Sequence, residues 1–295
     1  MISVPDVPLR HQQLIVTLYG LYGREVDGSF PVSVLIALLG DLGHDAPGVR
    51  SSVSRLKAKG VLHSVRTDRG PGYEISPEAM EIFTAGDERI FSSPRSVPGD
   101  PWVLAIFSVP ESQRNRRHQL RTELAGLGFG MVSAGVWIAP AHVRDEAQRR
   151  LESRGLGEFV EFFTGEYGPE SDMRAKVTQW WDLEAIDTRL GQFLELYGDA
   201  LEQWISLLGP DPVATHEKDA DELRREAFRY YVPLLTLWRR FPYRDPGLPL
   251  DYLPLGWKGT EAQAVFQGVH RLIGPLAAEH ARSLIGVPAK SAQLV

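Results

Sequence analysis

Three helix-like segments followed by a hairpin pattern lie between residues 10 and 75, and this order restricts the possible fold more than any other feature. The first two segments, "RHQQLIVTLYGLYG" and "PVSVLIALLGDLG", repeat leucine at helical spacing. The third has Asp45 as a predicted N-cap, Pro47 in its first turn and Gly60 as its predicted stop. The strand-like "VLHSVR", the turn "TDRGPG" and "YEI" then indicate a β-hairpin. Three helices and a hairpin predict a winged helix-turn-helix domain.

Positive charge is concentrated in the third helix and the hairpin, although the whole chain has a net charge of -6 and a pI of about 5.8. The segment from Arg50 to Arg69 contains six basic residues and one acidic residue, Asp68. Such a local patch points to an anionic partner, and serines and arginines on an exposed helix suit base edges in a major groove. The predicted contacts to double-stranded DNA are Arg50, Ser51, Ser54, Arg55 and Lys57 in the helix, with Arg66 and Arg69 in the wing. The alternative is a winged helix that binds another protein.

A second domain is expected after the Ser-, Pro- and Gly-rich stretch "FSSPRSVPGDP". Strand-like and helix-like segments then alternate as β-α-β-β-α-β, which is the order of a ferredoxin-like fold. From residue 171 the chain has mainly helical patterns. We therefore predict an α+β multidomain chain with a winged-helix domain at 1–92, a ferredoxin-like domain at 97–170 and a helical domain for effector binding or dimerisation at 171–295.

One stretch of the helical region combines aromatic rings with guanidinium groups, which suits an aromatic acid or its phosphate-bearing conjugate. The candidate effector-binding residues are Trp238, Arg239, Arg240, Tyr243 and Arg244. A salt-bridged helix end packed under a loop is the alternative. His270 and His280 are not expected to share a metal, because ten residues of helix separate them by about 15 Å.

Composition limits the setting in which the chain works. It contains no cysteine, which excludes disulfides and thiolate metal sites. Its N-terminus has no secretory pattern, and no apolar run approaches the roughly 20 residues that span a bilayer. We expect a cytoplasmic protein with no membrane association.

Four stretches resemble the PaaX-type transcriptional repressors of phenylacetate catabolism. They are "LIVTLYGLYG", "GVRSSVSRLKAKGVL", "WVLAIFSVPESQRNRRHQLRTELAGLGFGMVSAGVWIAP" and "WRRFPYRDPGLPLDYLPLGWKG". The resemblance implies a homodimeric repressor that binds an inverted-repeat operator and is not an enzyme. It also implies release from DNA by phenylacetyl-CoA or another acyl-CoA, with no cofactor, but it implies no particular residues for the effector.

The central segment also resembles the small CRISPR-associated endoribonucleases of ferredoxin-like fold, which suggests a metal-dependent nuclease as an alternative. Those enzymes place a metal-binding Asp at the end of the first strand. Ser108 stands at that position here, and Glu111 lies beyond Pro110. A serine does not supply the carboxylate that Mg²⁺ requires, so we expect no nuclease activity and a structural or dimerising role.

Overall fold

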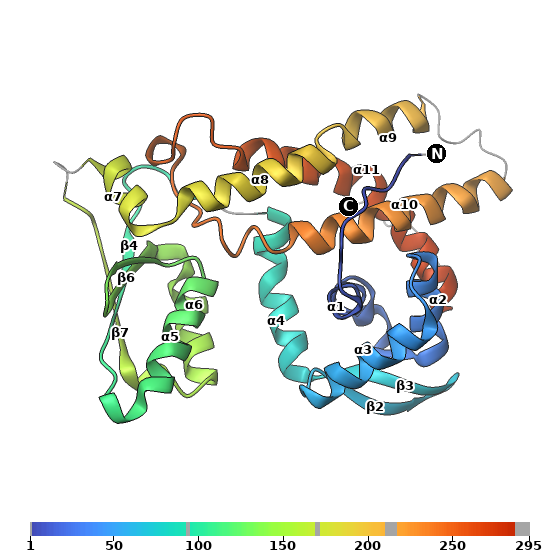
Figure 1. Cartoon of the computed structure of the whole chain (residues 1–295), viewed down its shortest axis with the longest axis horizontal. Coiled ribbons are helices and arrows are strands. Elements are labelled where there is room, and N and C mark those ends of the chain that lie inside the picture. The colour runs from blue at the N-terminus through green and yellow to red at the C-terminus, as the bar shows by residue number, and fades with distance from the viewer. Residues whose placement is uncertain (1, 93–94, 169–171, 210–216, 287–295) are drawn as a thin grey trace. The chain divides into compact units, whose positions relative to one another are not determined.

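The computed structural model describes residues 2–92, 95–168, 172–209 and 217–286 (Figure 1). The chain is a mixed α+β, multidomain protein with two small antiparallel sheets and several helices, which confirms the predicted class at this level. It divides into two compact units. The first comprises Met1–Gly86, Phe193–Trp238 and Gln263–Val295, and the second comprises Asp87–Gln192 and Arg239–Ala262. The three-domain division at 1–92, 97–170 and 171–295 stays a prediction.

The N-terminal part of the first unit contains the predicted helices and hairpin. The elements are α1 (His11–Tyr22), β1 (Ser29–Pro31), α2 (Val32–Asp41), α3 (Ala46–Ala58), β2 (Leu62–Thr67), β3 (Gly70–Ile75) and α4 (Pro77–Asp87). Proline in the first turn favours the start of α3, and Asp45 occupies the N-cap position, although its side chain accepts no capping hydrogen bond. Gly60 follows the end of α3 with φ of 71°, a conformation that glycine adopts without strain.

The strands of this unit form a three-stranded antiparallel sheet in the order β1-β3-β2. Only Asp68 and Arg69 lie between β2 and β3. The Tyr19 hydroxyl of α1 donates to the carbonyl oxygen of Tyr73 in β3 at 2.7 Å. The hairpin is therefore tied to the helices by a side chain from the buried face of α1.

Two glycines at the end of α2 offer a matched test of backbone conformation. A methyl group added at Gly40 or Gly43 meets no atom within 4 Å, but Gly43 has φ of 84° whereas Gly40 is helical. Gly40→Ala is expected to raise the free energy of unfolding by about 0.5–1 kcal/mol, because alanine restricts the unfolded chain. Gly43→Ala is expected to lower it by about 1 kcal/mol through left-handed strain. Urea denaturation of both variants measures the two effects, and equal signs would contradict this account.

Helices from the C-terminal half complete the first unit. They are the end of α8 (Leu183–Tyr197), α9 (Ala200–Leu208), α10 (Glu217–Trp238) and most of α11 (Gly259–Ile285). The hydroxyl of Thr236 in α10 donates to the hydroxyl of Thr17 in α1 at 2.8 Å, and both residues are buried. The core of this unit is thus built from both ends of the sequence.

Polar contacts join the same segments at the surface. Asp41 at the end of α2 accepts from Arg225 and from His280, each at 2.7 Å. The two carboxylate oxygens of Glu25 accept hydrogen bonds from Arg282, one from Nη2 at 2.7 Å and one from Nε at 2.8 Å. A bidentate arginine holds both position and orientation, so α11 is aligned on the N-terminal helices.

The second unit contains a four-stranded antiparallel sheet. Its elements are β4 (Trp102–Phe107), α5 (Arg114–Gly126), β5 (Gly130–Ser133), β6 (Val136–Pro140), α6 (Arg144–Ser153) and β7 (Val160–Gly165), and the strand order is β5-β6-β4-β7. Helices α5 and α6 lie on one side of the sheet (Figure 1). Val103, Ala105 and Phe107 alternate along β4 and pack into the core with Leu120 and Leu151.

An aromatic cluster covers part of the other face of this sheet. Helix α7 (Met173–Trp180) and the following Trp181 pack there against Trp102. The Trp181 indole donates to the carbonyl oxygen of Gly128 at 2.9 Å. A methyl group at Gly130 would lie 2.6 Å from the same indole, so glycine allows this close approach. Trp102 packs in the same cluster, with ring centres 6.3 Å from Trp180 and 6.5 Å from Trp181.

Candidate nucleic-acid interface

Helix α3 separates apolar and basic residues onto different faces. Val49, Val53 and Leu56 are buried in the core of the first unit, together with the small polar Ser52. The predicted DNA-contacting residues of this helix all have exposed side chains: Arg50, Ser51, Ser54, Arg55 and Lys57. The helix thus presents its serines and cations to solvent, because its apolar stripe takes up the inward face.

Two of these cations contact uncharged neighbours, so their positive charge is not neutralised by these contacts. The Arg55 guanidinium donates through Nη2 to Ser52 Oγ at 3.1 Å. The Lys57 ammonium lies 5.6 Å from the centre of the Tyr73 ring, which places it next to strand β3. Lys57 therefore links the exposed face of α3 with the hairpin.

Negative charge is absent from the immediate partners of this surface. Within the described part of the chain, no ion pair involves Arg50, Arg55, Lys57, Lys59, Arg66 or Arg69. Elsewhere in the first unit the arginines Arg224, Arg225 and Arg282 are paired with carboxylates. Unpaired surface cations gathered on one helix and its hairpin attract an anionic partner.

The two predicted wing residues differ in their surroundings. The Arg66 side chain is exposed on β2 and forms no hydrogen bond or ion pair among the described residues. Arg69, in the turn, donates through Nη1 to the carbonyl oxygens of Leu284 at 3.2 Å and Ile285 at 2.7 Å. These carbonyls end α11, where the helix dipole favours a cation. Arg69 is therefore held by the C-terminal helix in this conformation.

Lys59 also belongs to the basic surface, although sequence reasoning left it out of the predicted contacts. It is exposed at the end of α3 and its ammonium donates to Gln12 Oε1 of α1 at 3.4 Å. Lys59 is one of the six basic residues between Arg50 and Arg69, and this clustering in the sequence is the signal that would have included it among the predicted contacts. The N-terminal end of α1 thus lies next to the end of the candidate recognition helix.

The candidate effector residues fall into both units. The Trp238 ring belongs to the first unit, where it stacks on Phe266 with ring centres 4.7 Å apart. Arg239, Arg240, Tyr243 and Arg244 belong to the second unit. Burial, followed by the nearby guanidinium of Arg240, lowers the pKa of Arg239 to about 10. The role of these five residues in effector binding stays a prediction.

Tyr243 has an identified cationic neighbour within the second unit. The Arg89 guanidinium lies 5.4 Å from the centre of its ring. Burial is the main cause of the raised pKa of the Tyr243 hydroxyl, so this side chain is neutral at physiological pH. The ring of Tyr243 therefore lies beside a guanidinium group, that of Arg89, which was not among the predicted effector residues.

Residues of the nuclease alternative have structural contacts. The backbone nitrogen of Ser108 donates to the carbonyl oxygen of Phe159, and Glu111 pairs with Arg117 at 3.0 Å. Across the described ranges, no group of three or more His, Asp or Glu side chains is placed to hold a metal ion. In the same ranges, no helix is both long enough and apolar enough to cross a membrane.

Comparison with known families matches three consecutive segments of the chain. Residues 10–79 match the model described as PaaX-like protein, residues 97–177 match the PaaX protein central Cas2-like domain, and residues 181–283 match the PaaX-like protein C-terminal domain. The three matches follow one another in order and together cover most of the sequence.

The chain is also similar to individual proteins over most of its length. The chain is 24% identical over 279 residues to the transcriptional repressor PaaX of Escherichia coli (strain K12), covering 93% of this chain and 84% of that one. The uncharacterized protein Rv0674 from Mycobacterium tuberculosis has a similar fold, with a TM-score of 0.55 and 22% sequence identity. That similarity covers 92% of this chain and 97% of the other.

Proposed function

Because the chain belongs to the PaaX family of transcriptional repressors, we propose that it represses transcription by binding double-stranded operator DNA through α3 and the β2–β3 hairpin. The similarity to a repressor makes the chain a transcriptional regulator rather than an enzyme. The observation that carries the proposed interface is the exposed basic face of α3, whose cations have no acidic partner among the described residues.

We assign the α1–α3 segment and the hairpin to a winged helix-turn-helix. In such a domain the third helix enters the major groove, which is about 12 Å wide and admits one α-helix. Ser51, Ser54 and Arg55 are assigned to base edges, and Arg50 and Lys57 to phosphates. Arg66 and Arg69 are assigned to the DNA backbone or the minor groove. For Arg69 this requires release from the carbonyl oxygens that end α11.

We assign the second unit's sheet to a ferredoxin-like fold. Its element order β-α-β-β-α-β and its strand order β5-β6-β4-β7 support this assignment. A structural or dimerising role follows from the proposal, since Ser108 lacks the carboxylate of a metal-dependent nuclease. A homodimer would place two copies of α3 about one helical turn of DNA apart, roughly 34–36 Å, and would require an inverted-repeat operator.

The effector in this proposal is phenylacetyl-CoA or another acyl-CoA, which releases the repressor in an aromatic-acid catabolic pathway. The guanidinium groups of Arg239, Arg240 and Arg244 suit the phosphates of such a ligand, and the rings of Trp238 and Tyr243 suit an aromatic acyl group. Release requires the thioester to bind more tightly to the conformation that does not bind DNA than to the conformation that does. A coupling free energy of about 1–3 kcal/mol between the two ligands is typical.

Fluorescence anisotropy tests the proposal directly. The full chain is titrated onto labelled DNA from just upstream of its own gene at two salt concentrations, and phenylacetyl-CoA is then added. Salt-sensitive, sequence-preferring binding that the thioester reverses is the expected result. Binding that ignores the thioester would keep the repressor and refute this effector. No preference over unrelated DNA would refute this operator and favour a protein-binding role for the winged helix.

Lys57→Ala tests whether this side chain contacts a phosphate. Loss of one phosphate contact is expected to weaken binding to all DNA sequences alike and to reduce the slope of log K against log salt by about 1. Anisotropy titrations across a salt series measure that slope. Lys176→Ala in α7 of the second unit is the control and should leave the slope unchanged. An unchanged slope for Lys57→Ala would remove it from the interface.

A further inference from the structure

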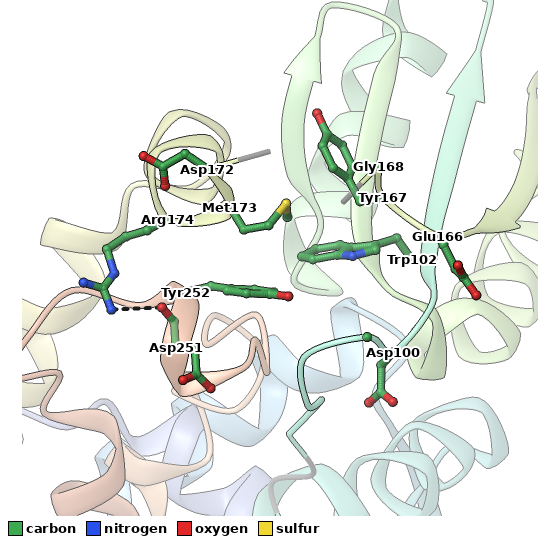
Figure 2. A pocket seen from close by; sticks show the side chains of 11 residues that line it. Asp100, Trp102, Glu166, Tyr167, Gly168, Asp172, Met173, Arg174, Asp251 and Tyr252 are labelled. Carbon is green, nitrogen blue, oxygen red and sulfur yellow. Dashed lines mark hydrogen bonds between the residues drawn. The ribbon is translucent and has the colours of Figure 1, made fainter. Parts of the chain in front are cut away.

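A cavity of about 720 Å³ lies in the second unit (Figure 2). It is lined by residues around the start of β4, the segment after β7, the start of α7 and the short helical turn at Leu250–Tyr252. Its volume falls in the range of about 300–1,000 Å³ that small-molecule sites occupy. These lining residues are separate from the five candidate effector residues.

Aromatic rings form one wall of this cavity. Trp102 and Tyr252 are nearly parallel, with 17° between their planes and 6.4 Å between their ring centres. Tyr167 also lines the cavity and meets Trp180 edge to face at 5.6 Å. Figure 2 shows the sulfur of Met173 turned toward Trp102. The wall is therefore polarisable and electron-rich, and the tryptophan cluster behind Trp102 holds it in place.

Carboxylates surround these rings. Asp100, Glu166, Asp172 and Asp251 line the cavity, against a single cation, Arg174. Figure 2 shows the four acids distributed around the central rings, with their carboxylates toward the outside. None of the four forms an ion pair within the described ranges.

Two of the four carboxylates accept hydrogen bonds from nearby backbone nitrogens. Asp100 accepts from the backbone nitrogen of Val97 at 2.9 Å, and Asp172 accepts from that of Ala175 at 3.1 Å. The Arg174 guanidinium donates to the backbone carbonyl oxygen of Asp251 at 2.9 Å and forms no ion pair with the Asp251 carboxylate in the described part of the chain. The cavity consequently has a negative potential around an aromatic wall.

We infer that this cavity binds a small organic cation, an ammonium group on an apolar body. The face of an aromatic ring attracts a cation within about 6 Å of its centre, and surrounding carboxylates raise the local concentration of cations. The same charges repel the phosphates of an acyl-CoA. The cation would therefore be a second ligand of the chain, and the inference is independent of the DNA-binding proposal.

Calorimetric titration with choline tests the inference, and 3,3-dimethylbutan-1-ol serves as its neutral isostere. The two probes differ in having a quaternary nitrogen or a quaternary carbon, so the comparison isolates the charge. We expect saturable binding of choline and about tenfold weaker binding of the alcohol, with a difference that shrinks as salt is raised. Equal affinities, or no binding of choline, would overturn the inference.

Variants of the wall and rim locate the site. Tyr252→Leu is expected to weaken choline binding by about tenfold, whereas Tyr252→Phe keeps the ring and the affinity. Asp251→Asn combined with Glu166→Gln is expected to weaken binding by about fivefold at low salt. Glu161→Gln on β7, an exposed acid outside the cavity, is the matched control. Unchanged binding by both Tyr252→Leu and the double variant would place choline elsewhere and overturn the assignment.

Discussion

Arg55→Ala is expected to weaken operator binding by about 1–3 kcal/mol, which is roughly a five- to 150-fold loss of affinity. The side chain is exposed on α3, and Ser52 holds its guanidinium through a 3.1 Å hydrogen bond, so the fork is oriented before DNA arrives. A bidentate contact to guanine would carry sequence information, and its loss should also relax the preference at one base pair. Anisotropy with the operator and with single-base variants measures both effects.

Arg229→Ala is the matched control for that experiment. Arg229 is also exposed, but it lies on α10 of the same unit, outside the proposed interface. Its removal takes away the same charge and should leave affinity almost unchanged. Because both arginines are exposed, neither variant should change the free energy of unfolding by more than about 0.5 kcal/mol. Equal losses of affinity would show that net charge matters and that α3 has no specific role.

Phe228→Ala is expected to lower the free energy of unfolding of the first unit by about 3–5 kcal/mol. The Phe228 side chain is fully buried. Its ring centre lies 6.4 Å from that of Tyr22 in α1 and 5.2 Å from that of His280 in α11. Its truncation leaves a cavity between helices from both ends of the chain. Urea denaturation measures the loss, and hydrogen exchange should become faster in α1 and α3 as well as in α10.

Phe163→Ala provides the control with the same chemical change. Phe163 is 57% exposed on β7 of the second unit, so its truncation removes little buried surface. We expect a loss below about 1 kcal/mol and no change in the exchange of α1. If Phe228→Ala altered exchange in α10 alone, the N-terminal helices would be stable without the C-terminal ones, contrary to the expected coupling.

Local signals explain what could be predicted from the sequence. The Asp45, Pro47 and Gly60 signals correspond to the bounds of α3, because capping and chain reversal depend on neighbouring residues. The hairpin was also predicted, but its turn is shorter than the pattern "TDRGPG" indicates. Gly70, Pro71 and Gly72 pair with β2 as part of β3. Glycine and proline are depleted in strands, so this composition favours a turn, whereas the chain continues here as a strand.

Long-range packing explains what could not be predicted. The contact of Arg69 with the carbonyl oxygens of Leu284 and Ile285 joins residues more than 200 positions apart, and no local pattern signals it. The aromatic wall of the cavity likewise combines Trp102, Tyr167 and Tyr252 from three separate segments. Such groupings depend on how distant segments pack, whereas periodicity reports only the buried face of each segment.

The assembly of the first unit from both ends of the sequence affects the order of events during synthesis. The hydrogen bond between Thr17 and Thr236 joins residues 219 positions apart. At about 5–20 residues per second, a ribosome needs roughly 10–45 s to make the intervening chain. For that time the nascent N-terminal helices lack the partners that cover their apolar residues. The first unit is therefore complete only after α10 and α11 have been synthesised, and a chain terminated before them would lack these partners.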